Sequence, residues 1–264
     1  MCATCGCDDH VPEHGHGHGH GHGHGHHHHD HEHGNGRAQR ILLEERVLAK
    51  NDRIADTNRA TLRAQRIVAL NLVSSPGAGK TTLLERTIAE LRDIELGVIE
   101  GDQATANDAE RVRAAGAKAH QINTGTGCHL DAHMFAHALD ALAPAPGSLL
   151  FVENVGNLVC PALFDLGERK KVLIAAVTDG DDKPLKYPHM FRASSLVVLN
   201  KIDLLPYVRF DGARFAEAVR AVNPAAELLE VSATRGDGLA HWYAWLKREL
   251  APERHAVVER RPVP

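Results

Sequence analysis

A phosphate-binding loop constrains the fold of this chain more than any other feature of its sequence. The segment Ser74-Ser75-Pro76-Gly77-Ala78-Gly79-Lys80-Thr81-Thr82 follows the apolar run 67–73 and precedes a helix-like stretch, 82–92. A strand, a glycine-rich turn and a Lys-Thr pair that opens a helix allow backbone N–H groups to surround phosphate oxygens. Lys80 adds a cation for the β- and γ-phosphates, and the Thr81 hydroxyl can ligate Mg²⁺. The first position of the G-x-x-x-x-G-K-[ST] pattern carries Ser74, which adopts such a turn less freely than glycine. The predicted phosphate-binding residues are Ser75, Gly77, Ala78, Gly79, Lys80, Thr81 and Thr82.

Apolar strands alternate with helices from residue 67 onward. We expect strands at 67–73, 96–100, 118–122, 148–153, 172–177, 195–200 and 227–231, and helices at 82–92, 107–115, 129–142, 211–222 and 238–250. This alternation predicts an α/β P-loop NTPase with three α/β/α layers and a mostly parallel central sheet, whose ligands bind at the carboxyl ends of the strands. We expect three regions: a disordered Cys/His-rich metal-binding tail (1–36), an N-terminal helical lead-in (37–66) and the nucleotide-binding domain (67–264).

The lead-in lacks glycine and proline between residues 37 and 66, which predicts a helix. Leu43, Val47, Lys50 and Ile54 fall near one face, with Leu62 further along. That face is expected to pack beside the nucleotide domain, while a solvated helix is the alternative.

A guanine-recognition pattern, Asn200-Lys201-Ile202-Asp203, follows the apolar strand at 195–199. A carboxylate at Asp203 can accept two hydrogen bonds from guanine that adenine cannot donate, so mispairing would leave a buried charge unsatisfied. Asn200 and Lys201 hold the ring and the loop. Ser232 and Ala233 fit a further guanine-contacting loop, after the strand that ends at 231.

Two acids at strand ends are candidates to hold Mg²⁺. Asp102 ends the second apolar strand, and Glu153 opens Glu153-Asn154-Val155-Gly156. Gly156 can donate its N–H to the γ-phosphate, and Asn157 stands where GTPases often carry a water-orienting glutamine. Because its amide is shorter, we predict slow unassisted hydrolysis of GTP. The candidate catalytic residues are Lys80, Asp102, Glu153 and Asn157.

The first 36 residues carry metal ligands and few other side chains. Cys2, Cys5 and Cys7 offer three thiolates to one ion, which suits Ni²⁺ or Zn²⁺. Gly-His repeats have no apolar side chains to bury, so we expect a disordered segment that binds several divalent ions loosely. A purification tag is the alternative interpretation. The 13 tail histidines are His10, His14, His16, His18, His20, His22, His24, His26, His27, His28, His29, His31 and His33.

A second group of metal ligands lies within the predicted folded domain. Cys128 and His129 stand just before the expected helix at 129–142, where a helix N-terminus favours the metal-binding thiolate. Cys160 follows Glu153-x-x-Gly156 closely, so its position should depend on the γ-phosphate; a buried structural cysteine is the alternative. A two-fold dimer would complete the coordination. His133 and His137, one turn apart on a helix, form a weaker candidate.

Composition excludes several classes of protein. The tail holds five acids and no Lys or Arg, so the remaining residues carry 30 basic and 29 acidic side chains, a balance that gives no case for a nucleic-acid-binding face. No apolar run approaches the length of a membrane span, and the N-terminus does not read as a signal peptide. Cysteines clustered as metal ligands favour the cytoplasm.

Together these motifs resemble the HypB family, the SIMIBI-class GTPases of the HypB/UreG group that help insert nickel into [NiFe] hydrogenase. The resemblance rests on Cys2-x-x-Cys5-x-Cys7, the phosphate loop, Glu100-Gly101-Asp102, Gly127-Cys128-His129, Glu153-Asn154-Val155-Gly156-Asn157-Leu158-Val159-Cys160-Pro161, Asp182-Lys183-Pro184-Leu185-Lys186-Tyr187-Pro188 and Asn200-Lys201-x-Asp203. The family also has a Ser where Ser74 stands.

The resemblance implies a GTP-dependent homodimer that uses GTP and Mg²⁺. It implies a tight nickel site in the N-terminal cysteine motif and a weaker nickel or zinc site at Cys128, His129 and Cys160. It further implies two partners, a HypA-type zinc protein and the hydrogenase large subunit, and suggests nickel storage by the tail. The alternatives are a urease-type nickel GTPase, whose Cys-Pro-His differs from the adjacent Cys128 and His129, a nickel buffer with an incidental GTPase domain, and a metal-regulated signalling GTPase.

Overall fold

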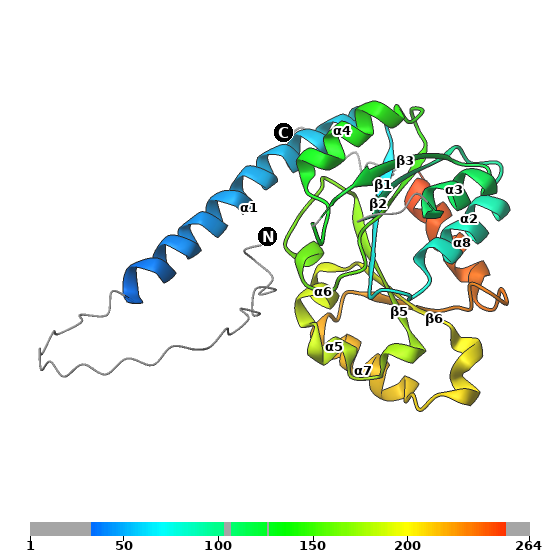
Figure 1. The fold of residues 1–264 in the computed structure, drawn as a ribbon. Coiled ribbons are helices and arrows are strands. Elements are labelled where there is room, and N and C mark those ends of the chain that lie inside the picture. Colours follow the sequence, from blue (N-terminus) through cyan, green and yellow to red (C-terminus); the bar gives the residue numbers. More distant parts are fainter. Residues whose placement is uncertain (1–32, 103–106, 126, 252–264) are drawn as a thin grey trace, which may run out of the picture.

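The computed structural model describes residues 33–102, 107–125 and 127–251 of the chain (Figure 1). The cysteine motif and all tail histidines but His33 therefore lie outside the described residues. Seven parallel strands form one sheet in the order β3-β2-β4-β1-β5-β6-β7. Their bounds are β1 Val68–Ser74, β2 Leu96–Asp102, β3 Lys118–Asn123, β4 Leu149–Glu153, β5 Lys170–Ala176, β6 Leu196–Asn200 and β7 Glu227–Glu230.

Helices cover both faces of this sheet. One face carries α2 (Lys80–Glu90), α3 (Asn107–Ala115) and α8 (Leu239–Leu250), and the other carries α1 (His33–Ala64), α4 (Ala132–Leu142), α6 (Pro188–Ala193) and α7 (Gly212–Val222) (Figure 1). Alternate side chains of β1 serve the two layers: Leu70 and Leu72 join the core under α2 and α8, whereas Ala69 packs with α1 and α4. The predicted three-layer α/β/α fold is confirmed.

Two short helices were not predicted. The helix α5 (Lys183–Lys186) and the helix α6 follow β5, each with a proline in its first turn. Proline is accepted there because the first N–H groups of a helix have no intrahelical partner. They place Lys183 beside the phosphate loop.

The first helix packs beside the domain as predicted, and Leu62 of the predicted face is buried, but the rest of that face was wrong. Val47 is 46% exposed and Lys50 is exposed, whereas Asn51, Ala55, Asn58 and Leu62 are buried against the domain. The prediction followed apolar residues, but the packed stripe includes two asparagines whose amides bind backbone groups. The outer half of α1 projects away from the sheet (Figure 1).

Candidate functional site

The phosphate loop connects β1 to α2. Gly77 and Gly79 have φ values of 72° and 98°, the left-handed region that glycine enters without strain. Gly79 also needs its missing side chain, because a Cβ there would lie 2.6 Å from Asn200 Nδ2. Lys80 Nζ donates to Ser74 Oγ at 2.8 Å. Ser74, the residue in place of the usual glycine, thus holds the lysine that is predicted to bind the phosphates.

The residues predicted to recognise guanine contact this loop from the end of β6. Asn200 Nδ2 donates to Ala78 O at 2.9 Å, and Asn200 Oδ1 accepts from Ala233 N at 3.0 Å. Lys201 Nζ donates to Gly77 O at 2.7 Å. One asparagine therefore joins the phosphate loop to the Ser232–Ala233 loop. Asp203 follows them, half-buried, at the start of a 3₁₀ turn.

Two buried carboxylates lie side by side behind the loop. Glu100 of β2 and Glu153 of β4 are paired across neighbouring strands, with exposed fractions of 2% and 4%. Thr81 Oγ1 donates to Glu153 Oε1 at 2.7 Å. The second oxygens, Glu100 Oε2 and Glu153 Oε2, have no hydrogen-bond partner among the described residues.

Burial raises the pKa values of both carboxyls. The pKa of Glu100 rises to about 8, by desolvation first and by repulsion from Glu153 second. The pKa of Glu153 rises to about 7, again by desolvation, although Lys80 and the Thr81 hydroxyl oppose the rise. Burial also lowers the pKa of Lys80. Unpartnered acidic oxygens next to a threonine hydroxyl suit a hard cation such as Mg²⁺, so these residues fit the predicted ion.

The segment after β4 lies directly on the phosphate loop. A Cβ on Gly156 would stand 3.0 Å from Pro76 Cα, so this turn needs glycine to approach so closely. Asn157 was predicted to orient water, yet its side chain is engaged elsewhere: Nδ2 donates to Cys128 O at 3.3 Å, and Oδ1 accepts from Val159 N at 2.7 Å. Asp102 ends β2, half-buried.

Cys128, His129 and Cys160 form a compact ligand group. Their ligand atoms all lie within 4.8 Å of one another. Cys128 Sγ lies 3.1 Å from Cys160 Sγ and 3.6 Å from His129 Nδ1. Sulfur and nitrogen ligands of one tetrahedral ion stand about 3.5 Å apart. Burial lowers the pKa of His129, which favours its neutral, metal-binding form.

The predicted helix position of Cys128 was wrong. The helix α4 begins at Ala132 rather than at 129, and Asp131 is its N-cap, accepting from Met134 N at 2.8 Å. Because a capping side chain and a turn separate Cys128 from the helix, the helix N-terminus does not explain its thiolate. His133 and His137 lie on the exposed face of α4, with Nε2 atoms 3.2 Å apart.

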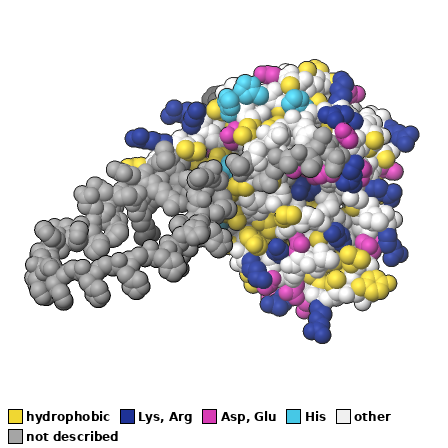
Figure 2. Space-filling model, in the orientation of Figure 1, with side chains coloured by type: hydrophobic (Ala, Val, Ile, Leu, Met, Phe, Trp, Pro, Cys, Tyr) yellow, Lys and Arg dark blue, Asp and Glu magenta, His cyan; other side chains and the backbone are white. Residues whose placement is uncertain are grey.

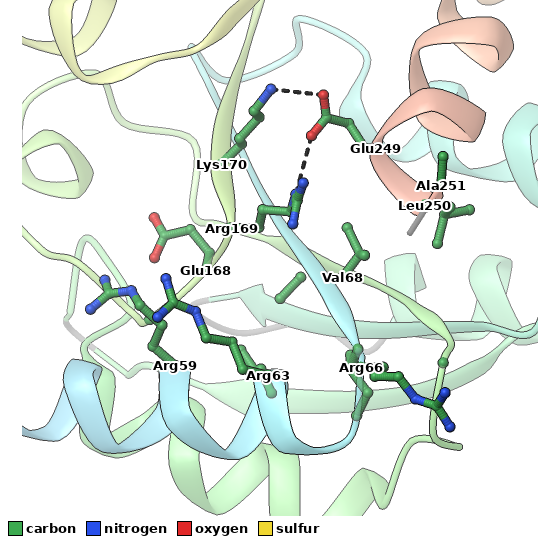
Figure 3. Close-up of a pocket in the computed structure, with 15 residues that line it drawn as sticks. Arg59, Arg63, Arg66, Val68, Glu168, Arg169, Lys170, Glu249, Leu250 and Ala251 are labelled. Atoms are coloured by element: carbon green, nitrogen blue, oxygen red, sulfur yellow. Dashed lines mark hydrogen bonds and ion pairs between the residues drawn. The ribbon is translucent and has the colours of Figure 1, made fainter. Parts of the chain in front are cut away.

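A cavity of about 870 Å³ lies at the opposite edge of the sheet, where the strands begin (Figure 3). It is lined by the end of α1, the starts of β1 and β5, and the end of α8. Arg169 and Lys170 there share Glu249. None of the predicted site residues lines this cavity. Acidic and basic side chains are interspersed on the visible surface (Figure 2), and no described helix is long and apolar enough to cross a membrane.

Sequence reasoning assigned no role to three residues that the structure places in the site. Glu100 pairs with Glu153, Lys183 Nζ donates to Ser75 Oγ at 3.3 Å, and Asn154 Oδ1 accepts from Leu130 N at 3.2 Å. A lone carboxylate within an apolar strand was a usable signal for Glu100. Lys183 and Asn154 lie in motifs that carry the family resemblance, but their contacts are non-local, so the motifs did not reveal what they bind.

Comparison with known proteins gives concordant matches. The family model described as CobW/HypB/UreG, nucleotide-binding domain, matches residues 68–230. The hydrogenase maturation factor HypB of Rhizobium leguminosarum bv. viciae is 57% identical over 219 residues, covering 82% of this chain and 72% of that protein. The hydrogenase maturation factor HypB of Escherichia coli K12 is 55% identical over 215 residues, covering 80% and 74%. The solved structure of HypB from Helicobacter pylori in complex with nickel has a TM-score of 0.72 and 37% identity, covering 76% of this chain and 95% of that one.

Proposed function

We propose that this chain, which belongs to the CobW/HypB/UreG family and within it to the HypB hydrogenase maturation factors, is a GTP-hydrolysing nickel metallochaperone. It delivers Ni²⁺ for maturation of the [NiFe] hydrogenase active site. The tail over residues 1–36, outside the described residues except for its last four, stores nickel on its cysteines and histidines.

The observation that carries the proposal is that one short segment serves both sites. Residues 153–160 begin at Glu153, which binds Thr81 of the phosphate loop, and end at Cys160 in the metal-ligand group. Between them, Asn157 binds the backbone of Cys128. A rearrangement at the γ-phosphate therefore moves one metal ligand directly and pulls on a second.

The residues of this chain have distinct roles in hydrolysis. Lys80 neutralises the β- and γ-phosphates, Gly156 donates its N–H to the γ-phosphate, and Asp203 selects guanine. Thr81, Glu100, Glu153 and Asp102 would hold Mg²⁺, which supplies positive charge to the phosphates when bound. Because the Asn157 amide is engaged with Cys128 and Val159, it does not stand free to orient water, which supports slow intrinsic hydrolysis.

Two sulfurs and one imidazole nitrogen suit both Ni²⁺ and Zn²⁺. The similar HypB from Helicobacter pylori was solved in complex with nickel, which supports Ni²⁺ as the cargo. Zn²⁺ would bind as a competitor.

The chain acts in the cytoplasm as a GTP-dependent homodimer. The dimer brings two copies of the ligand group together and completes the coordination. A HypA-type accessory protein and the hydrogenase large subunit are the partners. The relatives named above support these roles through their descriptions as hydrogenase maturation factors.

The test compares Ni²⁺ affinity with GDP and with a non-hydrolysable GTP analogue. Serine at Cys2, Cys5 and Cys7 confines the thiolate-to-nickel absorption band to Cys128 and Cys160, the remaining cysteines of the sequence. We expect different affinities in the two nucleotide states. Equal affinities would refute the coupling, because a ligand that binds two states equally well cannot shift the equilibrium between them.

A further inference from the structure

The packed half of α1 holds the two chain segments that carry the metal ligands. Asn51 is 6% exposed, and its amide binds both segments at once. Its Nδ2 donates to Asp165 O at 2.8 Å, and its Oδ1 accepts from Ala132 N at 2.9 Å. One side chain thus fixes residue 132, just after Cys128 and His129, relative to residue 165, just after Cys160.

Asn58, two turns further along the same face, makes the same bridge. It is 4% exposed, and its Nδ2 donates to Ala132 O at 2.8 Å and to Leu166 O at 3.0 Å. Asparagine is a poor helix former, and a buried amide is costly unless it is hydrogen-bonded. The buried stripe of a helix is usually filled by apolar residues such as leucine. Two buried asparagines in this stripe allow the helix to pack in only one position, as a single buried asparagine fixes the register of a coiled coil.

Further contacts fasten α1 to the segment 164–168. Gly167 has a φ of 93°, and a Cβ on it would stand 2.4 Å from Ala55 O, so its backbone lies directly on the helix. Arg59 forms an ion pair with Asp165. Arg59 of α1 and Glu168, just before β5, line the same cavity and lie close together in Figure 3.

The residues that α1 binds lie within a few positions of the metal ligands along the chain. Asp165 and Leu166 follow Phe164, whose ring centroid lies 4.0 Å from that of His129. Cys160 opens the 3₁₀ turn that leads into this segment. Ala132, bound by both asparagines, is three residues from His129.

We propose that α1 is the positioning element of the metal centre. Asn51 and Asn58 set the separation of segments 128–132 and 160–166, and hence the fit of Cys128, His129 and Cys160 to one transition-metal ion. The inference rests on the proposed function only in that the three ligands bind such an ion.

The test measures metal affinity in the full-length chain carrying serine at Cys2, Cys5 and Cys7. All remaining thiols then belong to Cys128 and Cys160. Free Ni²⁺ is fixed with a chelator buffer, so that tail histidines cannot deplete it, and the thiolate-to-nickel band is titrated. GDP affinity and the free energy of unfolding are measured on the same samples.

Asn58→Ala removes both bridging bonds of that residue, and we expect Ni²⁺ affinity to fall about tenfold, the lower end for loss of groups that orient ligands. GDP affinity should change less than about twofold. Thr87→Val is the matched control, because it deletes buried hydrogen bonds on the opposite face of the sheet. It should lower stability without altering Ni²⁺ affinity. Gly167→Ala, which forces the segment away from α1, should also weaken Ni²⁺ binding.

If Asn58→Ala fails to fold, Asn51→Asp serves instead, since it keeps the acceptor for Ala132 N and loses the donor to Asp165 O. Unchanged Ni²⁺ affinity in a folded Asn58→Ala or Asn51→Asp variant would overturn the positioning role. So would an equal loss in Thr87→Val, because the effect would then follow general stability. Absence of the thiolate band in the triple-serine parent, which keeps Asn51 and Asn58, would instead refute the proposed metal centre itself.

Discussion

Replacing Glu100 with glutamine should stabilise the nucleotide-free, Mg²⁺-free protein at alkaline pH. Glu100 and Glu153 stand side by side in the sheet, and each keeps one carboxylate oxygen without a hydrogen-bond partner. Burial raises the pKa of Glu100 from 4.5 to about 8. Glutamine has nearly the same shape and no charge to desolvate, so it removes this repulsion.

The direction of this change in stability follows from how tightly the folded and unfolded states bind a proton. A carboxyl whose pKa is raised in the folded state binds protons more tightly there than in the unfolded chain, so its ionisation costs stability as pH rises from about 4.5 to about 8. A full shift of this size corresponds to at most about 5 kcal/mol. Glu100 and Glu153 repel each other, so part of this shift belongs to the pair and not to Glu100 alone. We therefore expect Glu100→Gln to be about 2–3 kcal/mol more stable than the parent near pH 8.5. The advantage should vanish below about pH 4, where the carboxyl is protonated in both the folded and the unfolded states.

Urea unfolding in EDTA at a series of pH values gives the free energy of unfolding of the variant and of the parent. Titrating groups that the two proteins share contribute equally to both values, so they cancel in the difference. Glu249→Gln is the control: Glu249 is equally buried but paired with Arg169 and Lys170, so its neutralisation should lower stability. The same Glu100→Gln change should weaken Mg²⁺-dependent binding of GTP. A Glu100→Gln protein no more stable than its parent at pH 8.5 would refute the argument from buried charge.

Three further substitutions test separate contacts. Gly79→Ala places a Cβ 2.6 Å from Asn200 Nδ2 at a φ of 98°, so GTP binding measured by fluorescence titration should be lost. Thr87→Val leaves the buried indole N–H of Trp242 without its acceptor, which should cost about 1–3 kcal/mol in urea unfolding; no measurable change would contradict the role of this bond. Asp203→Ala removes the proposed acceptor for guanine, so the preference for GTP over ATP in competition binding should fall at least tenfold, whereas an intact preference would place recognition elsewhere.

Local patterns sufficed for most of the fold. All seven predicted segments contain strands. The five central strands are largely apolar, because a parallel sheet covered on both faces needs such segments, whereas the edge strands β3 and β7 are partly exposed and more polar. Glycine-rich turns marked the ligand edge. The two short helices after β5 escaped prediction because prolines at 184 and 188 divide that segment. The buried face of α1 escaped it because Asn51 and Asn58 are polar, and only the distant carbonyls that they bind reveal why they are inside.

The candidate site divides in the same way, into residues that a local pattern reveals and residues that only the fold brings together. Residues within one motif, such as Ser74 and Lys80, were found because a single turn of chain brings them together. Glu100 gained its role from sheet order, which sets β2 beside β4 and so aligns two carboxylates 53 positions apart in the sequence. Asn157 reaches Cys128 for the same reason: the segments after β3 and β4 leave the same edge of the sheet. Spacing along the chain identifies which residues can hold a phosphate or a metal, but strand order determines which of them act on one another. The proposed coupling between nucleotide and metal would therefore depend on the sheet, and a substitution that weakens it without touching a ligand should be sought where two non-adjacent segments meet.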